Sequence, residues 1–239
     1  MRAHNLIRLT ANCFLVCAGI SLWSAYAEQS YVTRYDAFAG YSYLSSPKIS
    51  LTGHGVQLQA GYRPRTWYSI GFDYSNFSGD LTLTPNLLPT ELQQSLGKQL
   101  AYLAAVGKLP AGYSLVVPAS SRTQTFALGP QLAFRHWEKT TLFVRPSLGA
   151  IYEEATPQPG DPIAKAIVAG LAPEGKRSDW QGFYGVGGGF DINVNKHFAM
   201  RFQADWGWDH LFNDLLAEGR QTIRFSIGPA FNFGRNIKE

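Results

Sequence analysis

Eight stretches of this chain alternate apolar and polar residues with a period of two. In the clearest one, Tyr68–Phe77, one face is aromatic and aliphatic while the other carries Ser, Gly and Asp. Successive side chains of a strand point to opposite faces, so each stretch predicts a strand with two different faces. The eight stretches are Arg34–Leu44, Val56–Tyr62, Tyr68–Phe77, Thr123–Arg135, Thr141–Tyr152, Trp180–Val194, Phe198–Trp208 and Thr222–Phe233.

Most of these stretches are longer than ordinary strands. They run to about ten to thirteen residues, whereas strands of globular proteins usually have about five or six. A tilted strand that crosses a membrane needs about 9–11 residues. The length therefore favours membrane-crossing strands.

The connections between the stretches alternate strictly between long and short. Four are long (45–55, 78–122, 153–179 and 209–220) and three are short (63–66, 136–140 and 195–197). Outer-membrane barrels have this arrangement, with an even number of strands, tight periplasmic turns and longer extracellular loops. We therefore predict an all-β chain: an eight-stranded antiparallel up-and-down transmembrane β-barrel whose four long connections are extracellular.

Residues 1–27 have the features of a cleaved secretory signal peptide. Arg2 and Arg8 precede a short apolar run, and small residues at Ala25 and Ala27 form an A-x-A cleavage site. The run is too short to span a bilayer as a helix. Both cysteines, Cys13 and Cys17, lie in this segment, so we expect residues 28–239 to form the barrel domain without disulfides or thiolate metal sites.

The composition excludes several classes of protein. Charged residues make up 16% of the chain and aromatic residues 14%, which is atypical of disordered chains and of coiled coils. The formal net charge of +4 is thinly spread along the sequence. We therefore expect no nucleic-acid partner.

Aromatic residues gather toward the two ends of the predicted strands. Trp67 and Trp137 fall at the short-turn end, and Trp180, Trp206 and Trp208 fall toward the long-loop end. Membrane barrels carry an aromatic girdle at each interface. We expect these five residues to form the two girdles.

The chain resembles the small eight-stranded outer-membrane β-barrel superfamily, the OmpA-like or opacity-protein-like transmembrane domains. The resemblance rests on AGYSY at 39–43, YSIGFDY at 68–74 and RFSIGPAFNF at 224–233, and extends as a pattern over residues 31–233. It implies export through the Sec pathway to a bacterial outer membrane. The chain departs from the family pattern in that residues 234–239 follow the aromatic Phe233, and no peptidoglycan-binding domain follows the barrel.

Three prolines, Pro130, Pro146 and Pro229, fall within predicted strands. Proline lacks the N–H that a sheet ladder requires, so it is confined to edges and bulges. We expect local bulges or bends at these positions on the lipid-facing side.

The polar faces of the predicted strands carry three acidic and three basic residues. The lumen of an eight-stranded barrel is about filled by side chains, and an unpaired charge there is costly. We expect an ion network that acts as a structural plug, with a gate that exchanges partners to pass ions as the alternative. The six residues are Asp73, Arg145, Asp191, Arg201, Asp205 and Arg224.

Candidates for catalysis or for cofactor and metal binding are few. His54 and His210 fall in predicted external loops without further ligands at useful spacing. The glycine-rich run 185–189 lacks the Lys-Ser/Thr and the helix of a phosphate loop, so we interpret it as part of a strand that allows close packing. We expect no enzyme activity, no cofactor and no metal.

The two longest loops contain predicted helices. Thr90 and Gln93 have the spacing of a capping box, which opens a helix over 91–106, and Asp161 with Pro162 opens another over 162–171. Six basic residues make these loops suitable for lipopolysaccharide phosphates, although a solvated loop surface explains them equally well. They are Lys98, Lys108, Arg122, Lys165, Lys176 and Arg177.

The function that these features favour is non-catalytic: envelope structure or surface interaction through the long extracellular loops. The expected partners are outer-membrane lipid and lipopolysaccharide, together with a surface protein bound through the loops. The first alternative is a narrow gated channel for ions or small solutes, and a less favoured one is a lipid-modifying enzyme using His54 or His210. A soluble lipocalin-like carrier would turn its charged faces outward, which the Gly- and Ser-rich charged faces disfavour.

Overall fold

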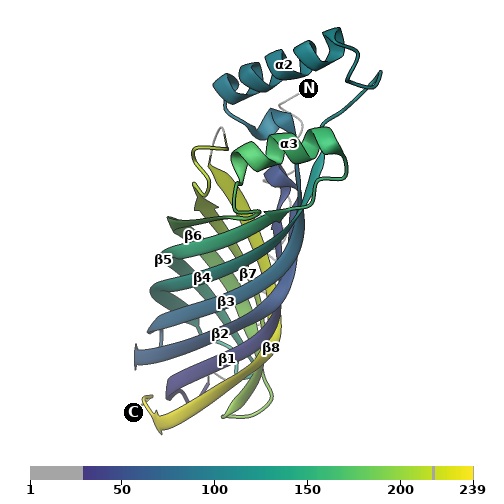
Figure 1. Cartoon of the computed structure of the whole chain (residues 1–239). Coiled ribbons are helices and arrows are strands. Elements are labelled where there is room, and N and C mark those ends of the chain that lie inside the picture. The colour runs from purple at the N-terminus through teal and green to yellow at the C-terminus, as the bar shows by residue number, and fades with distance from the viewer. Residues whose placement is uncertain (1–28, 217–218, 239) are drawn as a thin grey trace, which may run out of the picture.

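The fold is a closed barrel of eight antiparallel strands in chain order, with β1 hydrogen-bonded to β8 (Figure 1). It is seen in a computed structural model that describes residues 29–216 and 219–238, so the predicted signal peptide lies outside the described residues. The strands are β1 (Thr33–Ser46), β2 (Leu51–Arg65), β3 (Tyr68–Leu83), β4 (Val117–Phe134), β5 (Thr140–Pro157), β6 (Arg177–Asn193), β7 (Phe198–Asp209) and β8 (Arg220–Asn236).

The predicted eight strands and their up-and-down order are confirmed, but three predicted loops are too long. The segment between β3 and β4 begins after Leu83 and ends before Val117, rather than covering 78–122. The predicted loops 45–55 and 153–179 shorten in the same way, whereas 209–220 agrees with the end of β7 and the start of β8. The strand pairing continues above the apolar part of the barrel, where polar outward residues end the apolar alternation without ending the hydrogen bonding.

Two helices occur in the long connections, in the predicted places. They are α2 (Thr90–Ala105) and α3 (Pro162–Leu171), and short 3₁₀ turns lie at Pro47–Ile49 and Pro85–Leu87. Asp161 caps α3 as predicted, its Oδ1 accepting from the amides of Ile163 and Ala164 at 2.9 Å. No helix in the described part of the chain is long and apolar enough to cross a membrane.

The predicted capping box of α2 is wrong. The helix begins one residue early, with Pro89 as N-cap and without a side-chain cap bond. Thr90 is therefore already inside the helix. Gln93 instead donates to the carbonyl of Leu88 at 2.7 Å, which ties the first turn to the preceding segment.

Local bulges or bends were predicted at the prolines, and the register shows that no bulge occurs there. Pro130 and Pro146 lie opposite one another between β4 and β5, where the ladder is interrupted, yet the register is the same on either side of them. Pro229 lies at a similar interruption between β1 and β8. Because Pro130 and Pro146 face each other, both missing N–H groups fall at the same gap in the ladder. The two strands therefore pair on either side of the gap without an inserted residue. The register shifts occur instead near the short turns, between Thr33 and Tyr35 and between Tyr62 and Arg65.

The last strand does not end at its aromatic residue. β8 continues past Phe233 to Asn236, which is paired with Thr33, and the amide of Ile237 donates to the carbonyl of Val32 at 2.9 Å. Residues 234–236 are therefore part of the sheet, with Gly234 at a φ of 93°, a backbone conformation that glycine adopts without steric cost.

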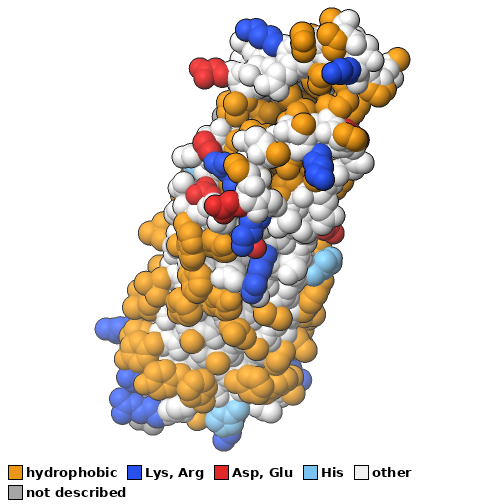
Figure 2. Space-filling view, in the orientation of Figure 1, with side chains coloured by type: hydrophobic (Ala, Val, Ile, Leu, Met, Phe, Trp, Pro, Cys, Tyr) orange, Lys and Arg blue, Asp and Glu red, His pale blue; other side chains and the backbone are white. Residues whose placement is uncertain are grey.

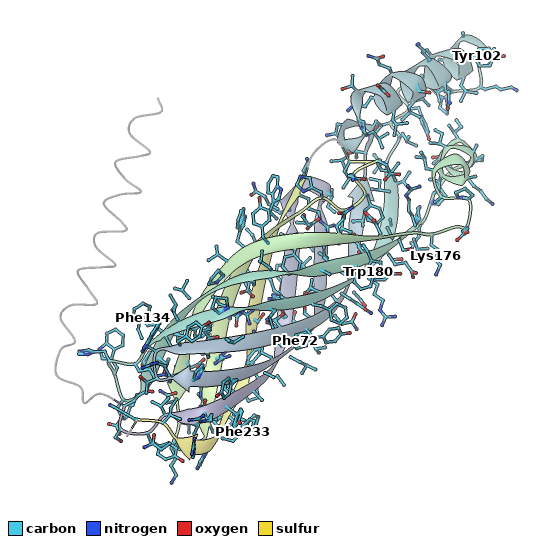
Figure 3. All side chains as sticks on the ribbon, turned by 90° about the vertical axis from the view of Figure 1, so that its left-hand side faces the viewer. Phe72, Tyr102, Phe134, Lys176, Trp180 and Phe233 are labelled. Atoms are coloured by element: carbon cyan, nitrogen blue, oxygen red, sulfur yellow. The ribbon has the colours of Figure 1, made fainter. Side chains whose placement is uncertain are left out.

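The outer face of the barrel is an apolar band. Figure 3 shows Phe134 and Phe233 near the short-turn end, Phe72 midway, and Trp180 and Lys176 toward the helices. Figure 2 shows the same distribution as orange surface over the lower barrel, with charged side chains above it. Exposed apolar residues of this face include Val56, Leu58, Ile70, Phe72, Leu128, Leu132, Val144, Leu148, Val186, Phe225 and Ile227.

Candidate functional site

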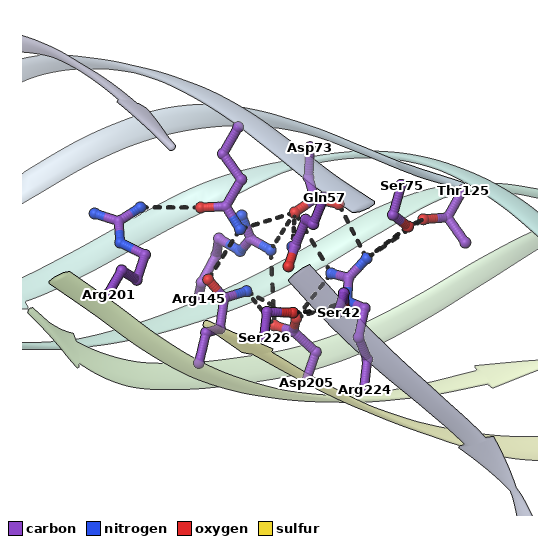
Figure 4. A network of polar contacts seen from close by, with 12 residues as sticks. Ser42, Gln57, Asp73, Ser75, Thr125, Arg145, Arg201, Asp205, Arg224 and Ser226 are labelled. Atoms are coloured by element: carbon purple, nitrogen blue, oxygen red, sulfur yellow. Dashed lines mark hydrogen bonds and ion pairs between the residues drawn. The ribbon is translucent and has the colours of Figure 1, made fainter. Parts of the chain in front are cut away.

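The six predicted interior charges lie inside the barrel, where ion pairs and hydrogen bonds link them. Figure 4 shows the part of this network that contains Asp73, Arg145, Arg201, Asp205 and Arg224. At its centre, Asp73 accepts from two guanidinium groups: Arg145 Nη2 at 2.9 Å and Arg224 Nη1 at 3.1 Å. Arg224 Nη2 also lies 2.7 Å from Asp205 Oδ2, and Arg145 Nη2 lies 3.6 Å from Asp205 Oδ1. Two carboxylates and two guanidinium groups from four strands, β3, β5, β7 and β8, thus balance one another across the lumen.

The other two predicted charges, Asp191 and Arg201, pair nearer the short-turn end. Arg201 Nε donates to Asp191 Oδ1 at 2.8 Å, and Arg201 Nη1 donates to Gln59 Oε1 at 2.9 Å. The amide nitrogen of Gln59 in turn donates to Asp73 Oδ2 at 2.9 Å. Gln59 therefore joins this pair to the central group. Each hydrogen bond in this series has a charged donor or acceptor, which strengthens it.

Five further charges of the described residues form ion pairs in the same lumen and were not predicted. Near the short turns, Asp36 lies 3.3 Å from both Arg63 and Arg201. Near the long loops, Arg220 Nη1 lies 2.5 Å from Glu153 Oε2, and Arg220 Nε lies 3.1 Å from Asp209 Oδ1.

The sequence analysis missed this last group because Glu153, Asp209 and Arg220 are the boundary residues of predicted loops. Had the strands been extended by one or two residues, their period of two would have placed these side chains inside. Asp36 lies on a strand face that also carries Phe38 and Leu44, so the alternation there does not mark the inner side.

An apolar plug closes the lumen above the central network. It consists of side chains from β1 to β5, from the β1–β2 and β3–β4 connections and from the β7–β8 connection, and the buried ion pair of Arg220 with Glu153 lies beside it. A residual void of about 40 Å³ separates the plug from the Arg224 and Asp205 pair. The members of the plug are Leu44, Ile49, Leu51, Phe77, Leu81, Leu87, Ala119, Ile151, Ala155, Leu211, Phe212 and Leu216.

The glycine-rich run lies in β6, as interpreted from the sequence, and makes room for the network. A Cβ on Gly187 would lie 1.8 Å from Asp205 Oδ1, and one on Gly189 would lie 2.9 Å from the ring of Phe143. These glycines face the lumen between larger side chains of β5 and β7. Because Gly187 has no side chain, the Asp205 carboxylate occupies the space that a Cβ would take there.

The structure places the five tryptophans at the ends named in the sequence analysis. Trp67 and Trp137 lie in the β2–β3 and β4–β5 turns. Trp180 lies near the top of β6, its ring 5.0 Å from that of Tyr152, and Trp206 and Trp208 lie in the upper part of β7.

The two histidines of the enzyme alternative lie apart from the interior charges. His54 is on the outer side of the barrel, where it bonds to the Tyr41 hydroxyl and packs against the Tyr43 ring at 5.3 Å between ring centres. His210 lies beside the Trp208 ring at 5.9 Å. Both are thus engaged by aromatic neighbours on the outer surface rather than by a nucleophile.

The long-loop end carries a folded cap, defined as the 3₁₀ turn η2 (Pro85–Leu87), α2, the following segment 106–116 and α3. Leu96 of α2, Leu115, Val117 of β4 and Ala164 of α3 form its core. The Tyr113 hydroxyl donates to both carboxylate oxygens of Asp161 at 3.1 Å, so the N-terminus of α3 is tied to the α2 connection. Partial burial, together with the Asp161 carboxylate, raises the pKa of Tyr113.

Polar contacts of Lys176 and Arg177 hold the segment that follows α3 against the barrel. Lys176 Nζ lies 2.8 Å from Glu154 Oε2, and this hydrogen bond raises the pKa of Lys176. Arg177 donates to the carbonyl of Leu171 at the end of α3 at 3.2 Å and pairs with Asp214 of the β7–β8 connection. Arg122, another of the six predicted loop cations, donates from Nε to Asn76 Oδ1 at 3.5 Å, so at least three of the six are engaged within the chain.

Solved structures of small bacterial barrels are similar to this chain. Neisserial surface protein A aligns with a TM-score of 0.50 at 12% identity, over 83% of this chain and 96% of that chain. OprG of Pseudomonas aeruginosa aligns with a TM-score of 0.48 at 9% identity, over 87% and 99%. Ail of Yersinia pestis, in complex with the heparin analogue sucrose octasulfate, aligns with 0.46 at 13% identity, over 84% and 99%.

The similarity to Neisserial surface protein A concerns the fold. No protein-family model matches the sequence, and no curated protein matches it. The chain has the fold of the small eight-stranded outer-membrane β-barrels: closed, all-antiparallel and up-and-down, with two short helices beyond the strands.

Proposed function

We propose that this protein is a non-catalytic bacterial outer-membrane barrel that acts at the cell surface through its cap. The observation that carries the proposal is the contrast between the two parts of the molecule. The lumen is filled by an ion network and an apolar plug, whereas the long-loop end is built into a structure with a core of its own. Long structured loops are commonly functional, so we assign the function of the protein to the cap.

The outer surface supports a place in the membrane. The exposed aliphatic and aromatic side chains form a band around the barrel, and Trp67, Trp137, Trp180, Trp206 and Trp208 lie toward its two ends. A soluble protein seldom exposes so large a contiguous apolar surface, whereas outer-membrane barrels have an apolar band about 25 Å tall with aromatic girdles. We assign these five residues to the two girdles, with the short turns in the periplasm and the cap outside.

The burial of the interior charges supports a plug rather than a channel. In a water-filled pore the lining side chains would be accessible to water, but Arg201 and Asp73 are each only 1% exposed. Pairing also favours a static arrangement, because moving one partner leaves another buried charge uncompensated. The barrel is in this proposal an anchor, and the interior network is its filling.

The cap offers two chemistries for a partner. Lys98, Lys108 and Lys165 lie on its helices and connections and suit the phosphates of lipopolysaccharide. Tyr102 near the end of α2 and Val106 just after it also expose apolar side chains, and Tyr102 lies at the far tip of the molecule in Figure 3. The proposed partners are therefore outer-membrane lipid, lipopolysaccharide and a protein at the cell surface.

Cysteine labelling of intact cells tests this placement. The barrel domain has no cysteine of its own, so single variants report one position each. A membrane-impermeant maleimide is expected to label Lys98→Cys in α2 on intact cells. Glu138→Cys, in the β4–β5 turn, is the matched control and is expected to react only after the outer membrane is permeabilised. Labelling of Glu138→Cys but not of Lys98→Cys on intact cells would contradict the proposed orientation.

A further inference from the structure

An apolar pocket of about 110 Å³ lies between the cap and the mouth of the barrel. Its floor is shared with the apolar plug and its upper wall is formed by the two helices. Apart from Phe212, the hydrophobic side chains around it are aliphatic, and they come from segments far apart in sequence. The principal ones are Leu81, Leu83, Leu88, Leu96, Val168 and Leu216.

The polar residues at the wall of this pocket are already bonded elsewhere. Glu153 is fully buried and accepts from Arg220 at 2.5 Å and from Ser121 at 3.0 Å. Arg177 is held by the Leu171 carbonyl and Asp214. A water in a cavity needs two to four polar partners, and apolar cavities without them stay dry. The pocket therefore favours an apolar occupant over water, and it offers no free charge to a headgroup.

We propose that this pocket is a binding site for a small uncharged apolar molecule of about the size of benzene or a short alkane. A dry cavity of about 150 Å³ lined by Leu, Ile and Phe is known to bind benzene, and the pocket here is somewhat smaller. The inference deepens the proposed function, because it gives the cap a class of ligand, and it rests on the cap lying outside the membrane.

The charges around the barrel indicate that the ligand comes from the external medium rather than from the bilayer. Asp80, Arg122, Glu154 and Lys176 lie on the strands and loop between the apolar band and the cap, where Figure 2 shows charged side chains above the orange surface. An acyl chain of the bilayer would have to cross this belt of charge to reach the pocket, at a large cost in desolvation. A small apolar molecule in the medium meets no such barrier.

Methyl NMR of the protein in lipid nanodiscs tests the site with benzene as the probe. The methyl signals of Leu96, Val168 and Leu216 are expected to shift and to saturate. Leu148 is 70% exposed on the lipid-facing side. Its methyl signals should shift only in proportion to the amount of benzene that partitions into the lipid. Shifts at the pocket methyls that stay linear and match those of Leu148 would overturn the proposal.

Substitutions in the two helices provide the matched comparison. Val168→Trp fills the pocket and is expected to weaken benzene binding at least tenfold. Val106→Trp makes the same change at an exposed position just after α2 and should bind as the wild type does. Should Val168→Trp fail to fold, Leu96→Ala enlarges the pocket instead and is expected to bind p-xylene at least tenfold more tightly than the wild type. Unchanged affinities in the folded variants would refute the site.

A lipid carrying a nitroxide at the end of its acyl chain distinguishes the two sources of ligand. It is expected to broaden the Leu148 methyls and to leave those of Leu96 sharp. Broadening at Leu96 would assign the pocket to a bilayer acyl chain and overturn the proposal. If benzene fails to bind while Lys98→Cys is still labelled on intact cells, the binding site is refuted and the surface placement of the cap stands. If Lys98→Cys is not labelled on intact cells, the surface placement, on which the binding site rests, is refuted.

Discussion

At the scale of single residues, the lumen is organised by guanidinium groups that each satisfy two carboxylates. Arg224 bridges Asp73 and Asp205, Arg201 bridges Asp191 and Asp36, and Arg220 bridges Glu153 and Asp209. The planar guanidinium has five donors in a fixed geometry, so one side chain can meet two acceptors from different strands. Lysine would lose this geometry.

Replacing Arg224 with Met is expected to destabilise the barrel strongly. Asp73 and Asp205 would lose a shared partner in the interior, and an uncompensated buried charge costs about 3–5 kcal/mol. The free energy of unfolding in urea, measured in lipid vesicles, reports the loss. Lys176→Met, which breaks an exposed pair with Glu154, is the control and should stay near the wild type. Equal stability of the two variants would show that the network contributes little.

Gly187 provides a second test at this scale. A Cβ there would lie 1.8 Å from Asp205 Oδ1, so Gly187→Ala is expected to displace that carboxylate and lower the unfolding free energy. Gly97 in α2 has open space around it, and Gly97→Ala should instead stabilise the helix by about 0.5–1 kcal/mol. Urea unfolding and hydrogen exchange of α2 measure the two effects. A tolerated Gly187→Ala would mean that the network can rearrange.

At the scale of elements, the position of the cap is set by the strands that extend beyond the apolar band. β3, β4, β5 and β6 continue into the long-loop region and lift α2 and α3 above the apolar surface (Figure 1). A few specific hydrogen bonds then hold the cap together. The one between Tyr113 and Asp161 joins the β3–β4 connection to the β5–β6 connection.

This bond makes the cap sensitive to alkaline pH. Partial burial and the neighbouring Asp161 carboxylate raise the pKa of Tyr113 above its ordinary value of 10.0. The unfolded chain therefore loses this proton before the folded chain does. The contribution to stability is complete below pH 10 and is lost as the pH rises through the raised pKa. The methyl shifts of Ile167 and Val168 should report loosening of α3 in that range, and the transition should be absent in Tyr113→Phe. An identical transition in Tyr113→Phe would assign it to another group.

At the scale of the whole molecule, two independent devices close the lumen: the ion network and the apolar plug. We therefore expect the refolded barrel to be silent in a planar bilayer, after a shift between unheated and boiled samples on SDS gels has shown that it is folded. Arg145→Met and Arg224→Met should be silent too, provided they fold, because the plug lies above them. Discrete openings that change in these variants would favour the gated channel over the anchor.

Local pattern was enough to predict the number of strands, their order and the two loop helices. A period of two in Tyr68–Phe77 or Phe198–Trp208 reflects a single strand with one side in an apolar environment. This pattern can be recognised in each strand without knowing which strands lie beside it. The same pattern placed all six predicted charges on inner faces. It failed where the outer side becomes polar, which is why the ends of β3 to β6 and the interior positions of Glu153, Asp209 and Arg220 were missed.

The partners of those charges were beyond the reach of the sequence. Arg224 meets Asp73, which lies 151 residues earlier in the chain, because closure of β1 on β8 and the register of each strand pair bring them to one height. A shift of one residue in any register would turn a whole side-chain set to the other face. The sequence by itself therefore determined the strands and what each presents inward. Only the closed tertiary structure decided which charges meet, how the plug fills the lumen, and that an apolar pocket remains beneath the cap.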